Sequence, residues 1–309
     1  MGFDTVIGLE GTHVTDAASP AATVDSTSFE DTSADEVFTK GALSRAHAGD
    51  LRKRFETAQP FPYVVIDNLF QPSFLDRVLS DYGAGFGDWV RYNTRDEVKT
   101  GTRPNAKLGA GSRAYFDVIQ RGQFTQFLSA ISGIQGLLPD PTLFGGGLHE
   151  IAPGGRFSVH TDFNKHPVTA LDNRLVFITY LNKGWEASWG GALELWDSVS
   201  KQCVDEVVPV FGRSILFAHT DTSLHGHPNP VATPDGRKRR SVAAYYYTNG
   251  GVEEGAARTT QFRAIRTSGQ AGGHGQLRVP DAGGWHPHRQ PRRGEAGRQN
   301  PELSDSRHL

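Results

Sequence analysis

The chain has 309 residues, of which 37% are hydrophobic and 21% charged, and its net charge is −2. This composition supports a sizeable globular core, and the small net charge argues against a nucleic-acid-binding surface. The single cysteine, Cys203, excludes a disulfide framework and any multi-cysteine zinc or iron–sulfur site. It is typical of a reducing compartment.

The sequence gives no sign of a membrane or secretory route. No apolar run approaches the ~18 residues of a membrane span. The N-terminus lacks a basic stretch followed by an apolar one, which a secretory signal requires. We therefore expect a cytoplasmic protein without a nucleic-acid or membrane partner, and the sequence leaves the oligomeric state undetermined.

Three segments differ in composition. Residues 1–50 are rich in Ser, Thr, Ala and Asp, and we expect them to be mostly disordered, with one short element near Asp35–Ala48. Residues 251–309 are rich in Gly, Arg and Pro and are expected to form a disordered tail, because they cannot bury enough apolar surface to offset ordering entropy. Residues 51–250 are expected to hold the folded domain.

Strand and helix patterns follow one another along residues 62–138. Pro62–Phe70 is typical of a strand. Pro72–Tyr82 predicts a helix, because it begins with proline and carries apolar residues at helical spacing. Gln123–Leu138 predicts a second amphipathic helix.

After Pro139 the pattern changes to short apolar runs between turn residues, which indicate closely spaced strands. The predicted strands are Leu143–Ile151, Arg156–His160, Leu175–Leu181, Gly191–Trp196, Cys203–Val208, Ser214–His219 and Ser241–Thr248. Helices followed by many short strands favour a mainly β fold with flanking helices (α+β), built as a sandwich or jelly roll.

Candidate metal ligands begin at the end of one predicted strand. His160 and Asp162 are two residues apart, so they project from the same strand face. A third ligand could come from His225 or His227. Two histidines and one carboxylate form the facial triad of non-haem Fe(II) oxygenases.

The His-Thr-Asp sequence occurs a second time, at His219–Asp221. Its nearest histidines, His225 and His227, are so close in sequence that we expect no separate strand pair between them and this copy. The first copy is therefore the better metal-site candidate.

A candidate anion site follows the histidines. Arg239 and Ser241 share one face of a predicted strand, so a guanidinium and a hydroxyl could hold one carboxylate of a dicarboxylate co-substrate. The adjacent Arg240 is the alternative cation.

These motifs occur in an order that resembles the 2-oxoglutarate/Fe(II) dioxygenases, most closely the branch that contains prolyl 4-hydroxylases. The resemblance covers about residues 60–250 and rests on GGRFSVHTDFN, RLVFITYLN, WGGALELWD, SILFAHTDTSLHGHPNPV and RRSVAAYYYT. It implies a double-stranded β-helix, a jelly roll whose mouth holds iron.

The resemblance also implies residue roles. His160, Asp162 and His225 match the iron ligands, because Ser-Leu-His-Gly at 223–226 corresponds to the family's distal histidine. Arg239, with Ser241, matches the 2-oxoglutarate-binding pair. The candidates for second-sphere or substrate contacts are His227, Tyr245, Phe163, Trp89 and Arg91.

The implied chemistry is hydroxylation of a C–H bond with Fe(II), 2-oxoglutarate and O₂, and with ascorbate as a candidate reductant. Halogenating relatives lack the carboxylate ligand, whereas Asp162 is present here. The implied substrate is an amino acid, peptide or secondary metabolite, or alternatively a prolyl or other side chain of a protein. Gly83–Ala114, with six Lys and Arg residues, corresponds to the segment that helps form the substrate lid.

Two other classes use the same scaffold. A cupin-type metal-dependent hydrolase or isomerase would use the triad but would not need Arg239 and Ser241. A non-catalytic jelly-roll binding module would not need His160, Asp162 and His225 together.

Overall fold

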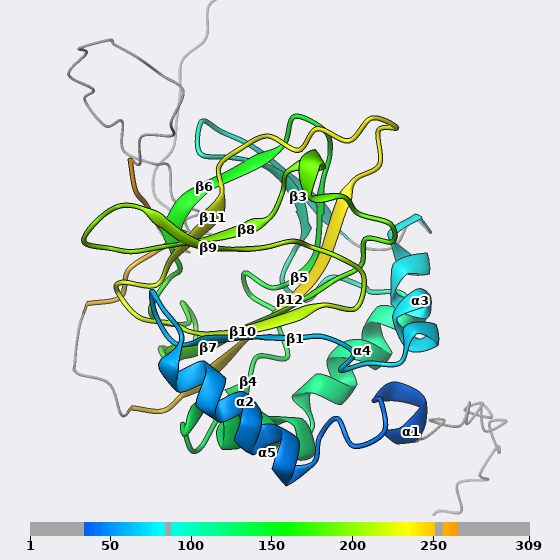
Figure 1. The fold of residues 1–309 in the computed structure, drawn as a ribbon, viewed down its shortest axis with the longest axis vertical. Coiled ribbons are helices and arrows are strands. Elements are labelled where there is room, and N and C mark those ends of the chain that lie inside the picture. The colour runs from blue at the N-terminus through cyan, green and yellow to red at the C-terminus, as the bar shows by residue number, and fades with distance from the viewer. Residues whose placement is uncertain (1–33, 84–87, 251–255, 265–309) are drawn as a thin grey trace, which may run out of the picture. The chain divides into compact units, whose positions relative to one another are not determined.

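The computed structural model describes residues 34–83, 88–250 and 256–264 (Figure 1). They all belong to the first of two compact units, Met1–Ile265. Most of the segments expected to be disordered, residues 1–33 and 265–309, lie outside the described residues, so that expectation stays a prediction. Residues 34–50 belong to the fold, which therefore begins before the expected boundary at residue 51.

Thirteen strands of the described residues form one antiparallel sheet, in which the main path runs β1-β10-β7-β12-β5-β3-β6-β11-β8-β9. The strands are β1 (Tyr63–Ile66), β2 (Trp89–Asn93), β3 (Glu97–Thr102), β4 (Leu138–Pro139), β5 (Gly147–Ile151), β6 (Arg156–Thr161), β7 (Asp172–Tyr180), β8 (Leu193–Trp196), β9 (Cys203–Val207), β10 (Ser214–Ala218), β11 (Leu224–His227), β12 (Arg239–Thr248) and β13 (Gln261–Phe262). The sheet curls into two facing halves, which confirms the predicted jelly roll (Figure 1).

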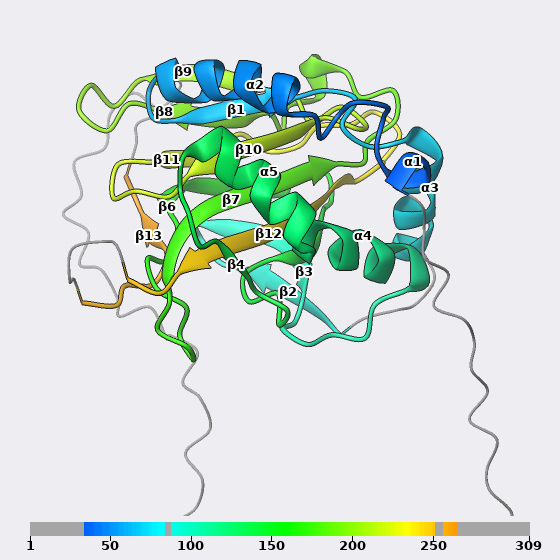
Figure 2. The same cartoon turned by 90° about the horizontal axis from the view of Figure 1, so that it is seen from below.

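Helices cover the outer face of the half that contains β1, β10, β7 and β12 (Figure 2). They are α1 (Ala34–Val37), α2 (Arg45–Thr57), α3 (Pro72–Ser80), α4 (Ala110–Gln120) and α5 (Gly122–Ser132), with short 3₁₀ turns at Asp81–Gly83 and Ala187–Trp189. The predicted first helix is confirmed. The second ends at Ser132 and not at Leu138, because Gly133 adopts a left-handed conformation (φ 75°) that stops it.

Alternation along β7 divides the core into two layers. Leu175 and Phe177 pack with the helices, whereas Val176 and Tyr180 face the barrel interior, where they meet β8 residues such as Leu195. Because successive side chains of a strand point to opposite faces, one strand supports both layers. The interior layer carries the polar side chains described below. None of the described helices is long and apolar enough to cross a membrane.

The segment predicted to form a lid is more regular than the sequence indicated. It contains the β2–β3 hairpin and the first turn of α4, and β3 pairs with both β5 and β6. The hairpin therefore bridges the two halves of the sheet. Three further short strands, β4, β11 and β13, were not predicted, since two to four residues carry little periodicity.

The position of β13 predicts where the chain can be shortened. A chain that ends after Ala264 keeps every described strand, so its thermal midpoint should change by less than about 2 °C. A chain that ends after Gly250 loses β13 and leaves part of the β6 edge unpaired, so its midpoint should fall by several degrees. Calorimetry of both truncated chains beside the full chain tests this, and equal midpoints for the two would contradict it.

Candidate active site

Strands β6 and β11 carry the histidines, and their ladder is irregular. His225 lies opposite His160, but His227 lies opposite Phe157, so β6 has one extra residue between the two pairs. This β-bulge bends the strand. Gly226 lies against it, and a Cβ at that position would be only 2.9 Å from the carbonyl oxygens of Phe157 and Ser158. The Ser-Leu-His-Gly motif therefore ends in glycine because the bulge leaves no room for a side chain.

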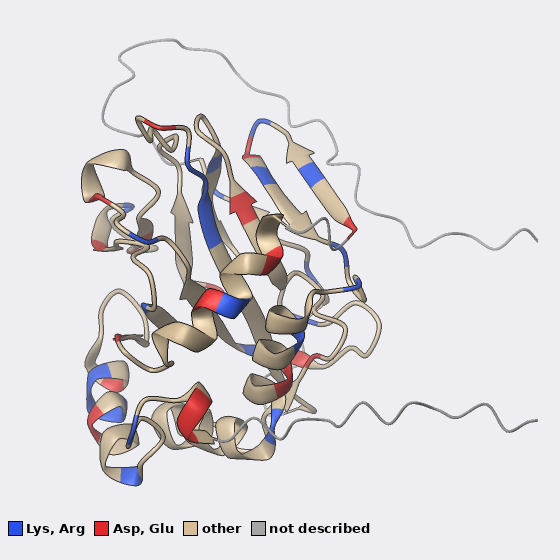
Figure 3. Ribbon diagram, turned by 90° about the vertical axis from the view of Figure 1, so that its right-hand side faces the viewer, with Lys and Arg blue, Asp and Glu red and all other residues tan. Residues whose placement is uncertain are grey.

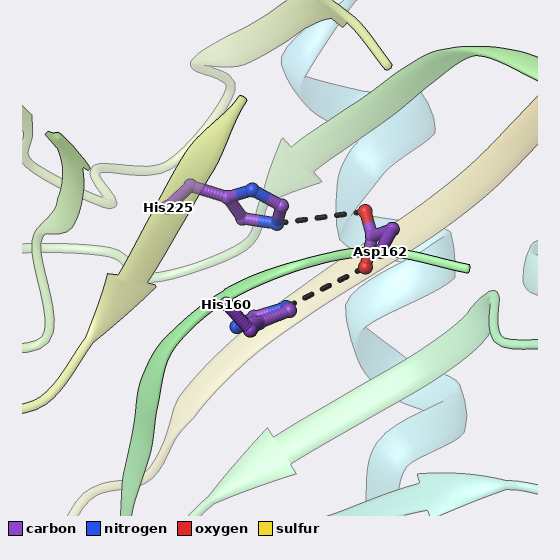
Figure 4. A group of neighbouring side chains, drawn as sticks. All are labelled: His160, Asp162 and His225. Atoms are coloured by element: carbon purple, nitrogen blue, oxygen red, sulfur yellow. Dashed lines mark ion pairs between the residues drawn. The ribbon is translucent and has the colours of Figure 1, made fainter. Parts of the chain in front are cut away.

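His160, Asp162 and His225 converge inside the barrel (Figure 4). Asp162 Oδ1 lies 3.4 Å from His160 Nε2, and Asp162 Oδ2 lies 3.5 Å from His225 Nε2. All three side chains are buried, and their candidate ligand atoms lie within 4.8 Å of one another. Three buried donor atoms at this spacing can bind one metal ion.

Backbone carbonyls fix the direction of both imidazole rings. His160 Nδ1 lies 2.8 Å from the carbonyl oxygen of Ser158, and His225 Nδ1 lies 2.9 Å from that of Ser223. Because a carbonyl only accepts hydrogen bonds, each Nδ1 is the protonated nitrogen. Each Nε2 then directs its lone pair toward Asp162, which is the tautomer that metal-binding histidines use.

The donor set fits a divalent transition metal. His160 Nε2 and Asp162 Oδ2 are buried without a hydrogen-bond partner, and buried polar atoms of this kind normally have one. Two imidazole nitrogens and one carboxylate on one side of the ion match the facial triad that binds Fe(II) and leaves positions open.

The protonation states favour metal binding. Burial raises the pKa of Asp162, but His225 and His160 lower it more, so that its pKa lies well below the usual range. Burial is also the main reason that the pKa of His225 falls to about 4. At neutral pH the carboxylate is ionised and this imidazole is neutral, as ligands must be.

Arg239 lies in the same interior. It is only 5% exposed, its Nε donates to the carbonyl oxygen of Gly191 at 2.6 Å, and its guanidinium lies 5.0 Å from the centre of the Tyr180 ring. Gly191 has φ 71°, and a Cβ there would approach Arg239 Cδ to 2.9 Å. The Gly-Gly turn thus holds the arginine. No acidic side chain of the described residues pairs with Arg239.

The two adjacent arginines have opposite environments. Arg240 points outward, where it and Lys238 pair with Glu150. Figure 3 shows such acidic and basic residues interspersed along the described ribbon. Ser241 is buried opposite His149 on β5 and Tyr180 on β7. The geometry therefore favours Arg239 over Arg240 as the buried cation.

The remaining candidates differ in their burial and in the side chains that they contact. His227 is buried, and neither ring nitrogen has a hydrogen-bond partner. Phe163 and Tyr245 pack together with ring centres 4.9 Å apart. Trp89 packs on Tyr82 at 5.9 Å, and Arg91 is exposed on β2.

The second His-Thr-Asp copy does not form a metal cluster within the described part of the chain. The expected absence of a strand pair between this copy and His225 agrees with the described sheet, in which β10 pairs with β1 and β7 whereas β11 pairs with β6 and β8. Both ring nitrogens of the partly exposed His219 are buried without a hydrogen-bond partner, and Asp221 pairs with Arg258.

Sequence reasoning missed His149. It lies on β5, and burial, together with Lys99 and Arg239, lowers its pKa to about 3. Only the pairing of β5 with β12 brings it near Arg239, and no local spacing signals that pairing.

The family described as the 2OG-Fe(II) oxygenase superfamily matches residues 146–247. Mouse prolyl 3-hydroxylase OGFOD1 is 22% identical over 198 residues, which cover 61% of this chain and 33% of that protein. The chain thus spans about a third of the length of this curated relative.

Two solved structures are similar at low identity. A Trichoplax adhaerens prolyl hydroxylase, in complex with a hypoxia inducible factor peptide fragment, has a TM-score of 0.47 and 16% identity, covering 66% of this chain and 90% of its own. HygX from Streptomyces hygroscopicus, with nickel, 2-oxoglutarate and hygromycin B bound, has a TM-score of 0.46 and 12% identity, covering 64% and 87%.

The buried histidines predict a pH dependence of stability. Burial lowers the pKa of His225 to about 4 and that of His227 well below its usual value, so the unfolded chain takes up more protons than the folded one as pH falls below ~6.5. The free energy of unfolding of the metal-free protein should therefore decrease from pH 6.5 to 4. Urea unfolding at several pH values measures it.

The matched variant for this measurement is His227→Gln. This variant should reduce the slope of the unfolding free energy against pH by ~1.4 kcal/mol per pH unit, which corresponds to the uptake of about one proton fewer on unfolding. An unchanged slope would show that His227 is not buried in its neutral form.

Proposed function

We propose that this chain, which the 2OG-Fe(II) oxygenase superfamily matches over residues 146–247, is an iron-dependent dioxygenase of that superfamily that hydroxylates a C–H bond. The observation that carries this proposal is the pairing of a buried two-histidine, one-carboxylate cluster with a buried arginine that has no acidic partner among the described residues. A buried unpaired cation is costly, so the site requires an anion.

We assign His160, Asp162 and His225 as the residues that would hold Fe(II). Arg239, with Ser241 beside it, would hold the distal carboxylate of 2-oxoglutarate, because a guanidinium fork suits a carboxylate. When bound, Fe(II) supplies the chemistry in which 2-oxoglutarate, O₂ and a C–H bond become succinate, CO₂ and an alcohol. One oxygen atom enters succinate and the other enters the product.

The protein's own residues orient the reactants and exclude water. Ser158 and Ser223 hold the two imidazoles through their carbonyl oxygens, and the Gly191 carbonyl oxygen holds Arg239. The carboxylate of Asp162 occupies the position that halogenating relatives leave without one, so hydroxylation is the proposed outcome. Ascorbate is proposed as an accessory reductant only.

The proposed prime substrate is an amino acid, peptide or secondary metabolite. The names of the relatives include enzymes that act on prolyl residues, which supports a protein prolyl side chain as the alternative. We further propose that residues 34–264 contain the whole catalytic domain.

Substitution of the ligands tests the metal assignment. His160→Ala, Asp162→Ala and His225→Ala should each abolish 2-oxoglutarate-dependent turnover and weaken Co(II) binding, measured from its visible absorption, while circular dichroism stays unchanged. His227→Ala should cost about 10- to 100-fold at most, since that residue lies beside the ligands. Full activity in any of the three ligand variants contradicts the assignment. Metal-dependent hydrolysis without succinate would favour the cupin-type alternative.

Substitution of the arginine tests the co-substrate. Arg239→Ala should raise the KM for 2-oxoglutarate by about 10²–10³-fold, because a buried carboxylate would lose its charged partner. Arg239→Lys should recover part of the loss, as it keeps the charge without the fork. Saturation curves at fixed iron measure these values.

Arg240→Ala is the matched control for the arginine experiment, because that side chain pairs with Glu150 outside the barrel. Its KM should change little. A large rise in KM for Arg240→Ala together with a small one for Arg239→Ala would show that Arg240, and not Arg239, binds 2-oxoglutarate.

A further inference from the structure

Residues 256–264 lie beside the candidate metal site, although they follow the region that the family match covers. Within this segment, β13 pairs with the second half of β6, so that Phe262 lies opposite the metal-ligand candidate His160. The Arg263 amide donates to the carbonyl oxygen of Val159 at 2.9 Å. The segment thus occupies the β6 edge that β3 leaves free, since β3 pairs only with Arg156 and Phe157.

Asn164, two residues after Asp162, anchors the start of the same segment. Its side-chain amide donates to the carbonyl oxygen of Ala256 at 3.0 Å, and its side-chain oxygen accepts from the Arg258 amide at 2.6 Å. Arg258 also pairs with Asp221 of the second His-Thr-Asp copy. The segment is therefore fixed to the neighbours of two candidate metal ligands.

Phe262 is the side chain that this anchoring places. Its ring centre lies 5.7 Å from the His160 ring and 5.9 Å from the Phe157 ring, yet 37% of the residue is exposed. Phe157 lies 4.0 Å from His160. Two aromatic rings thus lie beside a candidate metal ligand, and the residue that carries one of them, Phe262, is partly exposed.

The aromatic surface continues onto the β2–β3 hairpin. Lys99 Nζ lies 3.7 Å from the centre of the Phe157 ring and 5.3 Å from that of Tyr92, which is also 37% exposed. Two cations of this surface have acidic partners, because Lys99 pairs with Glu97 and Arg258 with Asp221. The surface next to His160 therefore presents partly exposed aromatic rings together with these two paired cations.

We propose that Phe262 is a specificity-determining residue, an inference that rests on the proposed function. Its exposed part receives an apolar side chain or ring of the prime substrate. A C–H bond that is oxidised must come close to the metal, and Phe262 contacts one of the metal's ligands. Covering a half-exposed aromatic face with apolar atoms is favourable, whereas an unpaired charge placed there would lose hydration.

The test uses the full chain loaded with Mn(II) and 2-oxoglutarate, which gives a paramagnetic centre without turnover. The probes are the N-acetyl methylamides of leucine, phenylalanine and proline, compared with those of lysine and glutamate. Proton relaxation of each probe reports how often it approaches the metal. The variants are Phe262→Ala, Phe262→Leu and, as the matched control, Leu138→Ala, which removes another half-exposed apolar side chain from a short strand.

In the wild type and in Leu138→Ala, we expect the proton relaxation rates of the apolar probes to increase more than those of the charged probes. Phe262→Ala should weaken the binding of the apolar probes about tenfold, the loss of a typical aromatic contact, and Phe262→Leu should recover most of it. No preference for apolar probes in the wild type, or equal binding in wild type and Phe262→Ala, overturns the proposal.

Failure of the proposed function gives a different result. In that case Mn(II) binds equally well to the wild type and to His160→Ala. If Mn(II) binding requires His160 but probe binding is the same in wild type and Phe262→Ala, only the assignment of Phe262 fails.

Discussion

The pairing of β6 with β11 is the constraint on which the site depends. It places two imidazoles opposite each other, and the bulge in β6 allows this only because Gly226 has no side chain. The backbone carbonyls of Ser158 and Ser223 then fix both rings. Preorganisation of this kind removes most of the conformational cost of binding a metal, since the ligands need not move to meet it.

The barrel interior also buries two charged side chains that bound ligands could neutralise. Asp162 and Arg239 are both buried, but they are not paired with each other, so each needs a partner of opposite sign. Helices on the outer face bury apolar side chains and stabilise the fold independently of these groups. The chain can therefore keep a polar interior whose charges a bound cation and a bound carboxylate would neutralise.

The sequence predicted what is local or carried by motifs. Strand periodicity and turn residues predicted most of β5 to β12. The spacing of His160 and Asp162 predicted two ligands of the candidate cluster, and the family resemblance selected His225 over His227 as the third. The sequence could not show that β5 pairs with β12, which brings His149 toward Arg239, because pairing between distant strands leaves no local pattern. The choice between Arg239 and Arg240 likewise depended on which side of β12 faces the barrel.

The end of the fold shows why composition alone places boundaries poorly. Residues 256–264 are polar and mostly exposed, so their composition is that of a tail. They are nevertheless held by main-chain hydrogen bonds to β6 and by Asn164, interactions that need no apolar side chains. A strand added at an edge can therefore bring a single aromatic side chain to a metal site without extending the core. The domain core and the matched family region can both end at β12 while the site itself is completed by residues beyond it.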